Sequence, residues 1–233
     1  MTDTKTIAAV AYPGLTLLDL AGPVQMLAGL SQLDPRYRVV VVAESTRPME
    51  TDAVMSIVAT HRFEEVPDPD IVLVPGGMVP TFAAMADEKL LSYLHRAAAG
   101  AESMTSVCTG SLILGAAGLL TGRRATTHWS CVELLSEFGA VPVRERWVSD
   151  GPVLTAAGVS AGIDMALSLA SRLSGEEAAR SLQLAIEYDP EPPLGPIDWD
   201  NTDTGQWAPA LAAALREGLG DDSELAGRLA ARL

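Results

Sequence analysis

The segment TSVCTGSLILGAAGLL, residues 105–120, places a cysteine at the boundary between a strand-like run and a helix-like run. Unpaired backbone N–H groups and the helix dipole at the start of a helix favour a negative charge. We therefore expect the Cys108 thiol to ionise more readily than a free thiol, whose pKa is about 8.5. Ser106 and Gly110, two positions to either side, are small enough for the kind of sharp turn that presents a nucleophilic serine in hydrolases. The alternative is a buried, unreactive cysteine that packs as a small apolar residue.

The residue after the cysteine is Thr109, where a cysteine hydrolase of this architecture would carry a histidine that accepts the thiol proton. Peptide hydrolysis is therefore disfavoured, and another group must handle protons. The candidate is Asp19, which follows a Pro-Gly turn and has a leucine on each side. Burial among apolar side chains raises the pKa of a carboxyl, which can then hold a proton near neutral pH and donate it. Asp19 alternatively caps a helix, because aspartate is a strong N-cap.

Composition disfavours several other classes of protein. The 233-residue chain has a net charge of −14, which repels nucleic acid and anionic membranes. Its longest apolar run is too short to cross a bilayer, and the N-terminal residues lack the pattern of a secretion signal. Two cysteines, Cys108 and Cys131, make no disulfide framework, so we expect a reducing, cytoplasmic environment. The three histidines form no cluster with metal-ligand spacing, and we expect neither a metal nor a cofactor.

Short apolar runs alternate with longer segments of helical period. The runs that we expect to form sheet strands are residues 6–13, 37–44, 70–77, 103–108 and 152–158. The segments that we expect to form helices are residues 18–33, 81–100, 109–120 and 161–175, with a short strand or hairpin at 52–60. This alternation predicts a doubly wound α/β sandwich with a mostly parallel sheet, in which sites form at the carboxyl ends of strands. Gly76, Gly77 and Cys108 would then lie on one rim.

The composition changes at residue 189. Residues 189–209 are rich in proline, aspartate and glycine and predict a loop that follows the surface, before alanine-rich helices at 210–219 and 223–233. Residues 189–233 hold nine acidic residues and three arginines. We therefore divide the chain into an α/β domain, residues 1–190, and an acidic, proline-rich loop with a C-terminal helical extension, residues 191–233.

Four segments together resemble the DJ-1/PfpI superfamily, and within it the branch that contains isonitrile hydratases and the amidase-like domains of some AraC-type regulators. They are YPGLTLLDLAGP (12–23), VLVPGG (72–77), SVCTGSLILGAAGLLTGRRATTHW (106–129) and LTAAGVSAGIDMAL (154–167). The resemblance covers about residues 5–190. It implies a flavodoxin-like sandwich, usually a homodimer, in which a nucleophilic cysteine touches a carboxylic acid.

The matched motifs carry roles to particular residues. The resemblance makes Cys108 the nucleophile and Asp19 its acid partner. It implies that the backbone N–H groups of Gly77 and Thr109 stabilise developing negative charge. The remaining pocket residues that it implies are Gly76, Met78 and Val79.

Other positions carry further expectations. His128 would support the site from behind the cysteine or would pack in the core, and Cys131 is expected to be structural. Ala156 and Ala157 stand where relatives often carry glycines. The extra methyl groups imply a narrower pocket or a stiffer following helix.

The activity implied by the resemblance is hydration of a small apolar isonitrile to the N-substituted formamide. It would need no cofactor, and it would proceed through a Cys108 thioimidate with Asp19 as proton donor and then base. One alternative is a glyoxalase-type or deglycase-type enzyme acting on small α-oxoaldehydes. Another is a ligand-sensing module related to the AraC-type regulators, although the acidic tail lacks the basic helix that DNA contacts require. A third is a redox sensor in which Cys108 oxidises to the sulfinate. We expect a homodimer without nucleic-acid or membrane partners.

Overall fold

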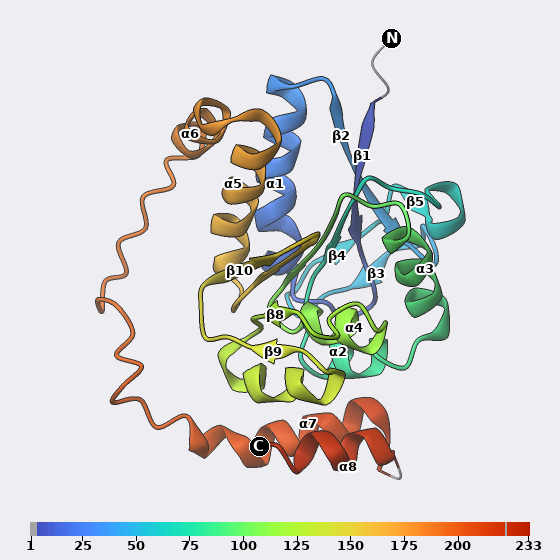
Figure 1. The fold of residues 1–233 in the computed structure, drawn as a ribbon, viewed down its shortest axis with the longest axis vertical. Coiled ribbons are helices and arrows are strands. Elements are labelled where there is room, and N and C mark those ends of the chain that lie inside the picture. Colours follow the sequence, from blue (N-terminus) through green and yellow to red (C-terminus); the bar gives the residue numbers. More distant parts are fainter. Residues whose placement is uncertain (1–3, 222) are drawn as a thin grey trace.

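The structure, a computed structural model, describes residues 4–221 and 223–233. A seven-stranded sheet with the strand order β10-β11-β7-β6-β1-β2-β5 runs through the middle of the chain (Figure 1). Its strands are parallel except for β10, which pairs antiparallel with β11 at one edge. The strands are β1 (Lys5–Val10), β2 (Tyr37–Ala43), β5 (His61–Arg62), β6 (Ile71–Val74), β7 (Ser103–Val107), β10 (Trp147–Asp150) and β11 (Val153–Ala156). The predicted doubly wound sandwich with a mostly parallel sheet is confirmed.

Helices cover both faces of this sheet, which is why its central strands are buried on both sides. Helices α1 (Leu17–Leu33) and α5 (Ala161–Ser174) lie side by side on one face, and α6 (Glu176–Ala185) packs against both. The opposite face carries α2 (Val79–Ala84), α3 (Glu88–Ala98) and α4 (Gly110–Ala116) (Figure 1). All four residues of β6 and all five of β7 are buried between the two layers.

Two predicted helices differ from those observed. The single helix expected over residues 81–100 is divided into α2 and α3, because the Asp87 side chain caps a new helix by accepting the Lys89 and Leu90 amides at 2.9 and 3.1 Å. The helix expected over 109–120 ends at Ala116, and Gly118 follows with a φ of 76°, a left-handed conformation that stops the helix.

Short elements complete the α/β body. Strands β3 (Met49–Glu50) and β4 (Ser56–Ile57) pair antiparallel, so the segment at 52–60 contributes to a small hairpin outside the main sheet. The others are β8 (Arg124–Ala125), β9 (Val141–Pro142) and the 3-10 segments η1 (Phe63–Glu65) and η2 (Trp129–Phe138). Strand β10, helix α6 and η2 were absent from the sequence prediction.

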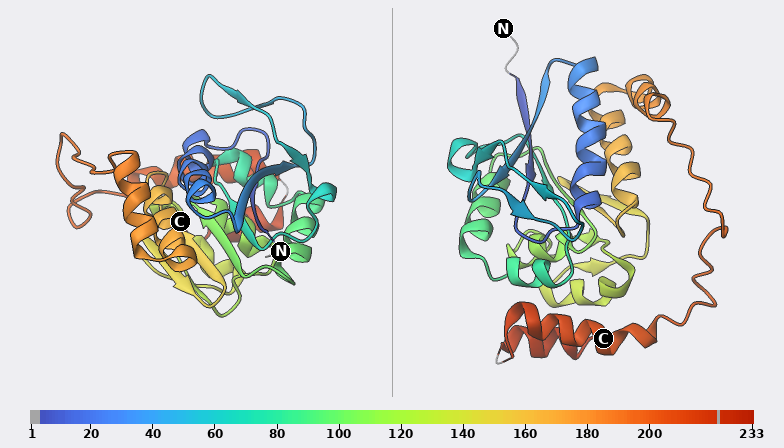
Figure 2. Two further views of the ribbon diagram at one scale, coloured as in Figure 1. Left: turned by 90° about the horizontal axis from the view of Figure 1, so that it is seen from above. Right: turned by 180° about the vertical axis from the view of Figure 1, so that it is seen from behind.

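The prediction that the proline-rich loop follows the surface is wrong. The segment between α6 and the 3-10 turn η3 (Gly205–Trp207) stands away from the body over much of its length and is exposed almost throughout (Figures 1 and 2). Each proline in this segment fixes φ and has no amide hydrogen to donate. Both properties disfavour close packing of the segment on the sheet domain. Beyond it, α7 (Ala208–Leu219) and α8 (Glu224–Ala230) form the predicted helical pair and pack against α2 and η2.

The carboxyl ends of β1, β6, β7 and β11 meet at one end of the sheet, and α7 and α8 lie beyond α2 and η2 at the same end of the molecule (Figure 1). Within the described residues, no helix combines the length and apolarity needed to span a membrane. The residues singled out by the sequence gather where these strands end.

Candidate active site

Cys108 sits on a sharp turn between β7 and α4. Its φ is 57°, a left-handed conformation that costs a residue with a side chain about 1–3 kcal/mol. Four hydrogen bonds hold it there. The Cys108 amide donates to the carbonyl oxygens of Ala156 and Ala157 at 3.2 and 2.9 Å. The Cys108 carbonyl accepts the hydroxyls of Thr127 and Ser111 at 2.8 and 3.2 Å. The predicted sharp turn is present.

Gly110 lets α4 start directly behind this turn. A Cβ at this position would lie 2.2 Å from the Val74 carbonyl oxygen and 2.7 Å from that of Pro75. No side chain fits at such distances, so the close approach of α4 to the end of β6 requires glycine. The small residue expected two positions after the cysteine therefore has a packing reason.

Asp19 lies in the first turn of α1 and is fully buried. The residue at the N-cap position of that helix is Thr16, so the alternative interpretation of Asp19 as an N-cap is wrong. Its Oδ2 accepts the Gly76 amide at 3.0 Å, while the buried Oδ1 accepts no hydrogen bond within the described part of the chain. Burial raises the pKa of the Asp19 carboxyl to about 7, opposed by the Gly76 amide and by the Cys108 side chain.

The Cys108 thiol and the Asp19 carboxyl are neighbours that affect each other's proton affinity. Burial raises the pKa of the Cys108 thiol well above its ordinary value, the negative charge of Asp19 raises it further, and the Thr109 amide opposes both. The expectation that the start of α4 lowers the pKa of this thiol is therefore wrong, because desolvation outweighs the local amide. The two groups form a buried pair in which a proton on one favours ionisation of the other.

The amides expected to stabilise negative charge are only partly available. The Thr109 amide is directed at the Cys108 sulfur. The Gly77 amide instead donates to Thr109 Oγ1 at 3.1 Å, and the Gly76 amide is used by Asp19. The expected role of the Gly77 amide as a donor to substrate is corrected by this geometry, since that amide already has a buried partner within the protein.

Met78 and Val79 follow these glycines at the entry to α2. Met78 has a φ of 46° and an exposed side chain, whereas Val79 is half-buried. Their placement beside Gly77 on the rim agrees with the predicted position, and their contact with a substrate stays a prediction.

His128 is half-buried at the start of η2. Its Nδ1 pairs with the Ser130 hydroxyl at 2.8 Å, and burial lowers the pKa of its imidazole. Its neighbour Thr127 bonds the Cys108 carbonyl, and a Cβ on Gly158 would lie 3.1 Å from the imidazole. His128 thus lies behind the turn that carries the cysteine. Cys131 is fully buried.

The site includes two buried hydroxyls that the sequence did not reveal. Thr81, on α2, lies 2.8 Å from Thr109 Oγ1 and 3.0 Å from the Tyr12 hydroxyl, oxygen to oxygen. Tyr12 donates to the Pro75 carbonyl at 2.9 Å. Thr81 falls in a segment of helical period with no chemical motif, so no sequence signal marked it. Tyr12 precedes the Pro-Gly turn, and the motif around it does not distinguish its hydroxyl as part of the site.

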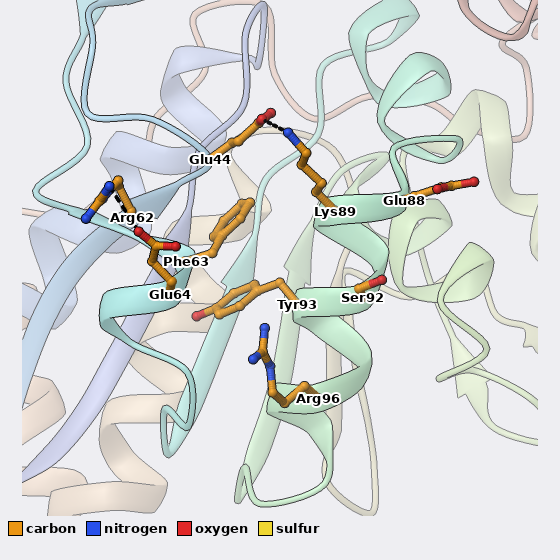
Figure 3. A pocket seen from close by; sticks show the side chains of 9 residues that line it. All are labelled: Glu44, Arg62, Phe63, Glu64, Glu88, Lys89, Ser92, Tyr93 and Arg96. Carbon is orange, nitrogen blue, oxygen red and sulfur yellow. Dashed lines mark hydrogen bonds and ion pairs between the residues drawn. The ribbon is translucent and has the colours of Figure 1, made fainter.

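A groove with a charged rim lies away from these residues. It has a volume of about 560 Å³ between β5, η1 and α3, and Figure 3 shows its charged rim around the stacked rings of Phe63 and Tyr93. Lys89 and Arg62 in this rim pair with Glu44 and Glu64. None of the predicted site residues lines it. Across residues 4–221 and 223–233, no group of three or more His, Cys, Asp or Glu side chains is placed to hold a metal ion.

The chain is similar to several known proteins. The sequence model of the DJ-1/PfpI family matches residues 5–172. An isonitrile hydratase of Pseudomonas putida is 44% identical over 188 residues, which cover 81% of this chain and 80% of that protein. The HTH-type transcriptional regulator CdhR of Pseudomonas aeruginosa is 29% identical over 79% of this chain, which spans 54% of the regulator.

Solved structures resemble the fold closely. The crystal structure of a THiJ/PfpI family protein from Pseudomonas syringae has a TM-score of 0.80 at 38% identity, covering 97% of this chain and 90% of that one. The crystal structure of Drosophila melanogaster DJ-1beta has a TM-score of 0.69 at 18% identity, covering 79% of this chain and 98% of that one. The second similarity concerns the fold alone.

Proposed function

Because this chain belongs to the DJ-1/PfpI family, we propose that it is an isonitrile hydratase-like lyase that adds water to the terminal carbon of an isonitrile. The product is the N-substituted formamide. The observation that carries this proposal is the buried pair formed by the Cys108 thiol and the Asp19 carboxyl, whose pKa is about 7. Such a carboxyl exchanges a proton near neutral pH, as hydration of an uncharged substrate requires.

The first half of the reaction forms a bond from sulfur to carbon. The pair holds one proton, and the nucleophile is the thiolate that exists when this proton resides on Asp19. The sulfur attacks the isonitrile carbon while Asp19 gives its proton to the same carbon. The result is a thioimidate, R–N=CH–S–Cys108, and an Asp19 carboxylate. The Thr109 amide, directed at the sulfur, stabilises the thiolate before attack.

The second half adds water and releases the cysteine. The Asp19 carboxylate takes a proton from water while the hydroxide adds to the thioimidate carbon, and the carboxyl returns that proton to nitrogen. When the carbon–sulfur bond breaks, the hydroxyl proton passes to Asp19 and the carbonyl of the formamide forms. The pair regains its single proton, so one carboxyl serves as acid and as base without a histidine at position 109.

The relative with 44% identity supports an isonitrile as the substrate. The buried, mostly apolar surroundings of Cys108 favour an uncharged, apolar substituent on it. A regulator-type role has less support, because residues 189–233 are acidic, whereas DNA contacts require a basic helix. Gly76, Met78 and Val79 are proposed to line the substrate pocket.

The proposal is tested by giving the purified protein cyclohexyl isocyanide and methylglyoxal in parallel. We expect formamide release from the isocyanide and little consumption of methylglyoxal. Turnover of methylglyoxal by a protein that leaves the isocyanide unchanged would replace the hydratase with a glyoxalase-type enzyme. Inertness toward both would favour the sensing or redox roles.

Three further features stay predictions of the sequence. They are a homodimer, a cytoplasmic location, and the division into an α/β domain over residues 1–190 and an extension over 191–233. The two free cysteines are compatible with a reducing environment. Size-exclusion chromatography with light scattering would test the homodimer.

A further inference from the structure

A closed set of hydrogen bonds ties the loop after β6 to the residue that follows the nucleophile. The Gly77 amide donates to Thr109 Oγ1 at 3.1 Å, and Thr109 Oγ1 lies 2.8 Å from Thr81 Oγ1. Thr81 Oγ1 lies 3.0 Å from the Tyr12 hydroxyl, which reaches the Pro75 carbonyl at 2.9 Å. The set therefore begins at Gly77 and returns to Pro75, two residues away. All three hydroxyl-bearing residues are buried.

The chemistry of the two ends fixes the direction of every hydrogen. The Pro75 carbonyl has no hydrogen, so the single hydrogen of the Tyr12 hydroxyl points to it, and Tyr12 must accept from Thr81. The Thr81 hydrogen is then used, so Thr81 must accept from Thr109. The Gly77 amide completes the set by donating to Thr109. The Thr109 hydroxyl is thereby committed to Thr81.

This commitment matters because Thr109 lies beside the Asp19 carboxyl. Thr109 Oγ1 and Asp19 Oδ2 are 2.6 and 2.9 Å from the position that a Cβ on Gly76 would occupy. Asp19 receives the Gly76 amide on Oδ2, and its buried Oδ1 is left without a donor within the described residues. A Thr109 hydroxyl released from Thr81 would be free to turn toward this carboxyl.

We propose that Thr81 is a positioning residue that acts through Thr109: by accepting the Thr109 hydrogen, it withholds that hydrogen from the Asp19 carboxyl and so keeps the carboxyl protonated. A hydrogen bond to a carboxylate favours its charged form. Because the Thr109 hydroxyl is committed to Thr81, the carboxyl keeps the proton that the proposed reaction transfers. Thr81 touches neither the sulfur nor the substrate in this account.

Other groups that face Asp19 act in parallel with this one. The Gly76 amide and the Cys108 side chain lower the pKa of the Asp19 carboxyl, and the negative charge of Asp52 raises it. Burial raises the pKa of the Tyr12 phenol and the nearby charge of Asp19 raises it further, so the phenol stays neutral. Removing the Thr81 hydroxyl leaves the Gly76 amide, Cys108 and Asp52 unchanged. Tyr12 loses the hydrogen bond that it accepts from Thr81, but it keeps its own hydrogen on the Pro75 carbonyl and stays neutral.

The experiment follows the infrared band of the protonated Asp19 carboxyl as pH is varied in the full-length protein, with Asp19→Asn used to assign the band. In Thr81→Val, the Thr109 hydroxyl loses its acceptor and turns to Asp19. We expect the titration midpoint to fall by about 1 pH unit from its value in the wild type. Thr81→Ser keeps a hydroxyl in place and should titrate as the wild type does.

Thr105→Val is the matched control. Thr105 is also a fully buried threonine, and its hydroxyl donates to the Val72 carbonyl at 2.9 Å, outside the closed set. Its substitution should leave the Asp19 midpoint unchanged. An unshifted midpoint in folded Thr81→Val, or an equal shift in Thr105→Val, would overturn the proposal.

A second variant covers the case in which Thr81→Val does not fold. In Tyr12→Phe, the Thr81 hydroxyl loses its acceptor and turns to Thr109, which frees the Thr109 hydrogen for Asp19. A lower midpoint is again expected, and an unchanged one overturns the proposal. The inference rests on the proposed function for its purpose, but the titration uses no isonitrile. A protein inert toward isonitriles can still show the shift, so failure of one does not imply failure of the other.

Discussion

At the scale of single residues, the chemistry depends on where one proton lies between Cys108 and Asp19. Burial raises the pKa of both groups, so neither is driven to ionise by its own surroundings. The carboxyl pKa of about 7 makes Asp19 the group that gives and takes a proton near neutral pH. A strongly acidic thiol is therefore not required, because the thiolate forms by transfer within the pair.

The same burial makes a prediction about stability. Because the pKa of Asp19 is raised from near 4 to about 7, the folded protein binds this proton more tightly than the unfolded chain does. The resulting stability is fully present below about pH 4 and is lost as pH rises toward 7. The neutral Asp19→Asn variant does not lose it. As pH rises between these values, the free energy of unfolding of the variant should increase relative to that of the wild type. The increase should total on the order of 4 kcal/mol, at about 1.4 kcal/mol per pH unit.

Urea denaturation of both proteins at several pH values measures this difference. Asp68→Asn, which alters an exposed aspartate, serves as the control and should follow the wild type at every pH. Parallel pH dependences for Asp19→Asn and the wild type would show that this carboxyl does not have the raised pKa.

Individual site residues were predictable to different degrees. The positions of Cys108 and Asp19 follow from motifs at the ends of β7 and β1, since parallel strands end at one rim. The pKa of the thiol was predicted in the wrong direction, because sequence shows the helix start but not the desolvation. The partner of the Gly77 amide could not be predicted, because it depends on the Thr109 rotamer and on Thr81 from a separate helix.

At the scale of elements, the site is a strand, a strained turn and a helix held in close contact. Apolar runs located the main strands, since parallel strands buried on both faces are rich in apolar residues. The division between α2 and α3 was missed because one local cap at Asp87 overrides a continuous helical period. Helix η2 was missed because its 3-10 geometry does not follow the 3.6-residue period.

Close packing of α4 yields a prediction for Gly110. In Gly110→Ala, the new methyl group would meet the carbonyl oxygens of Val74 and Pro75, which are backbone atoms and cannot swing aside. We expect a loss of about 1–3 kcal/mol in the free energy of unfolding, together with reduced activity as the Cys108 turn moves. Gly100→Ala is the control, since a Cβ there meets nothing within 4 Å. Equal stability of the two variants would contradict the packing argument.

At the scale of the whole molecule, the C-terminal helices are connected to the site indirectly: α7 packs against α2, which carries Thr81. Leu211 and Leu215 of α7 are buried, and Glu137 of η2 bonds Arg228 and Arg232 at 2.6 and 2.9 Å. The exposed arm before them carries Trp199, whose ring lies 6.1 Å from that of Trp129. The helices of this tail were predicted from their alanine-rich composition. Their docking was not, because it depends on surface shape that local sequence does not encode.

Gly218 is the point at which α7 meets α2. A Cβ there would lie 2.6 Å from the Phe82 Cβ and 2.7 Å from the Val79 carbonyl oxygen. Gly218→Val should therefore push α7 away from the helix that carries Thr81, lowering stability by about 1–3 kcal/mol and reducing turnover. Gly227→Val in α8 makes the same change where nothing lies within 4 Å. Thermal unfolding and turnover that are equal in the two variants would show that this contact does not support the site.

The account as a whole depends on Cys108 forming a bond to the isonitrile carbon with Asp19 supplying the proton. Formamide release from cyclohexyl isocyanide, measured side by side for the wild type, Cys108→Ala and Asp19→Asn, tests this most directly. We predict release by the wild type, none by Cys108→Ala, and a rate reduced by at least about 100-fold in Asp19→Asn. Release by Cys108→Ala at the wild-type rate would contradict the account.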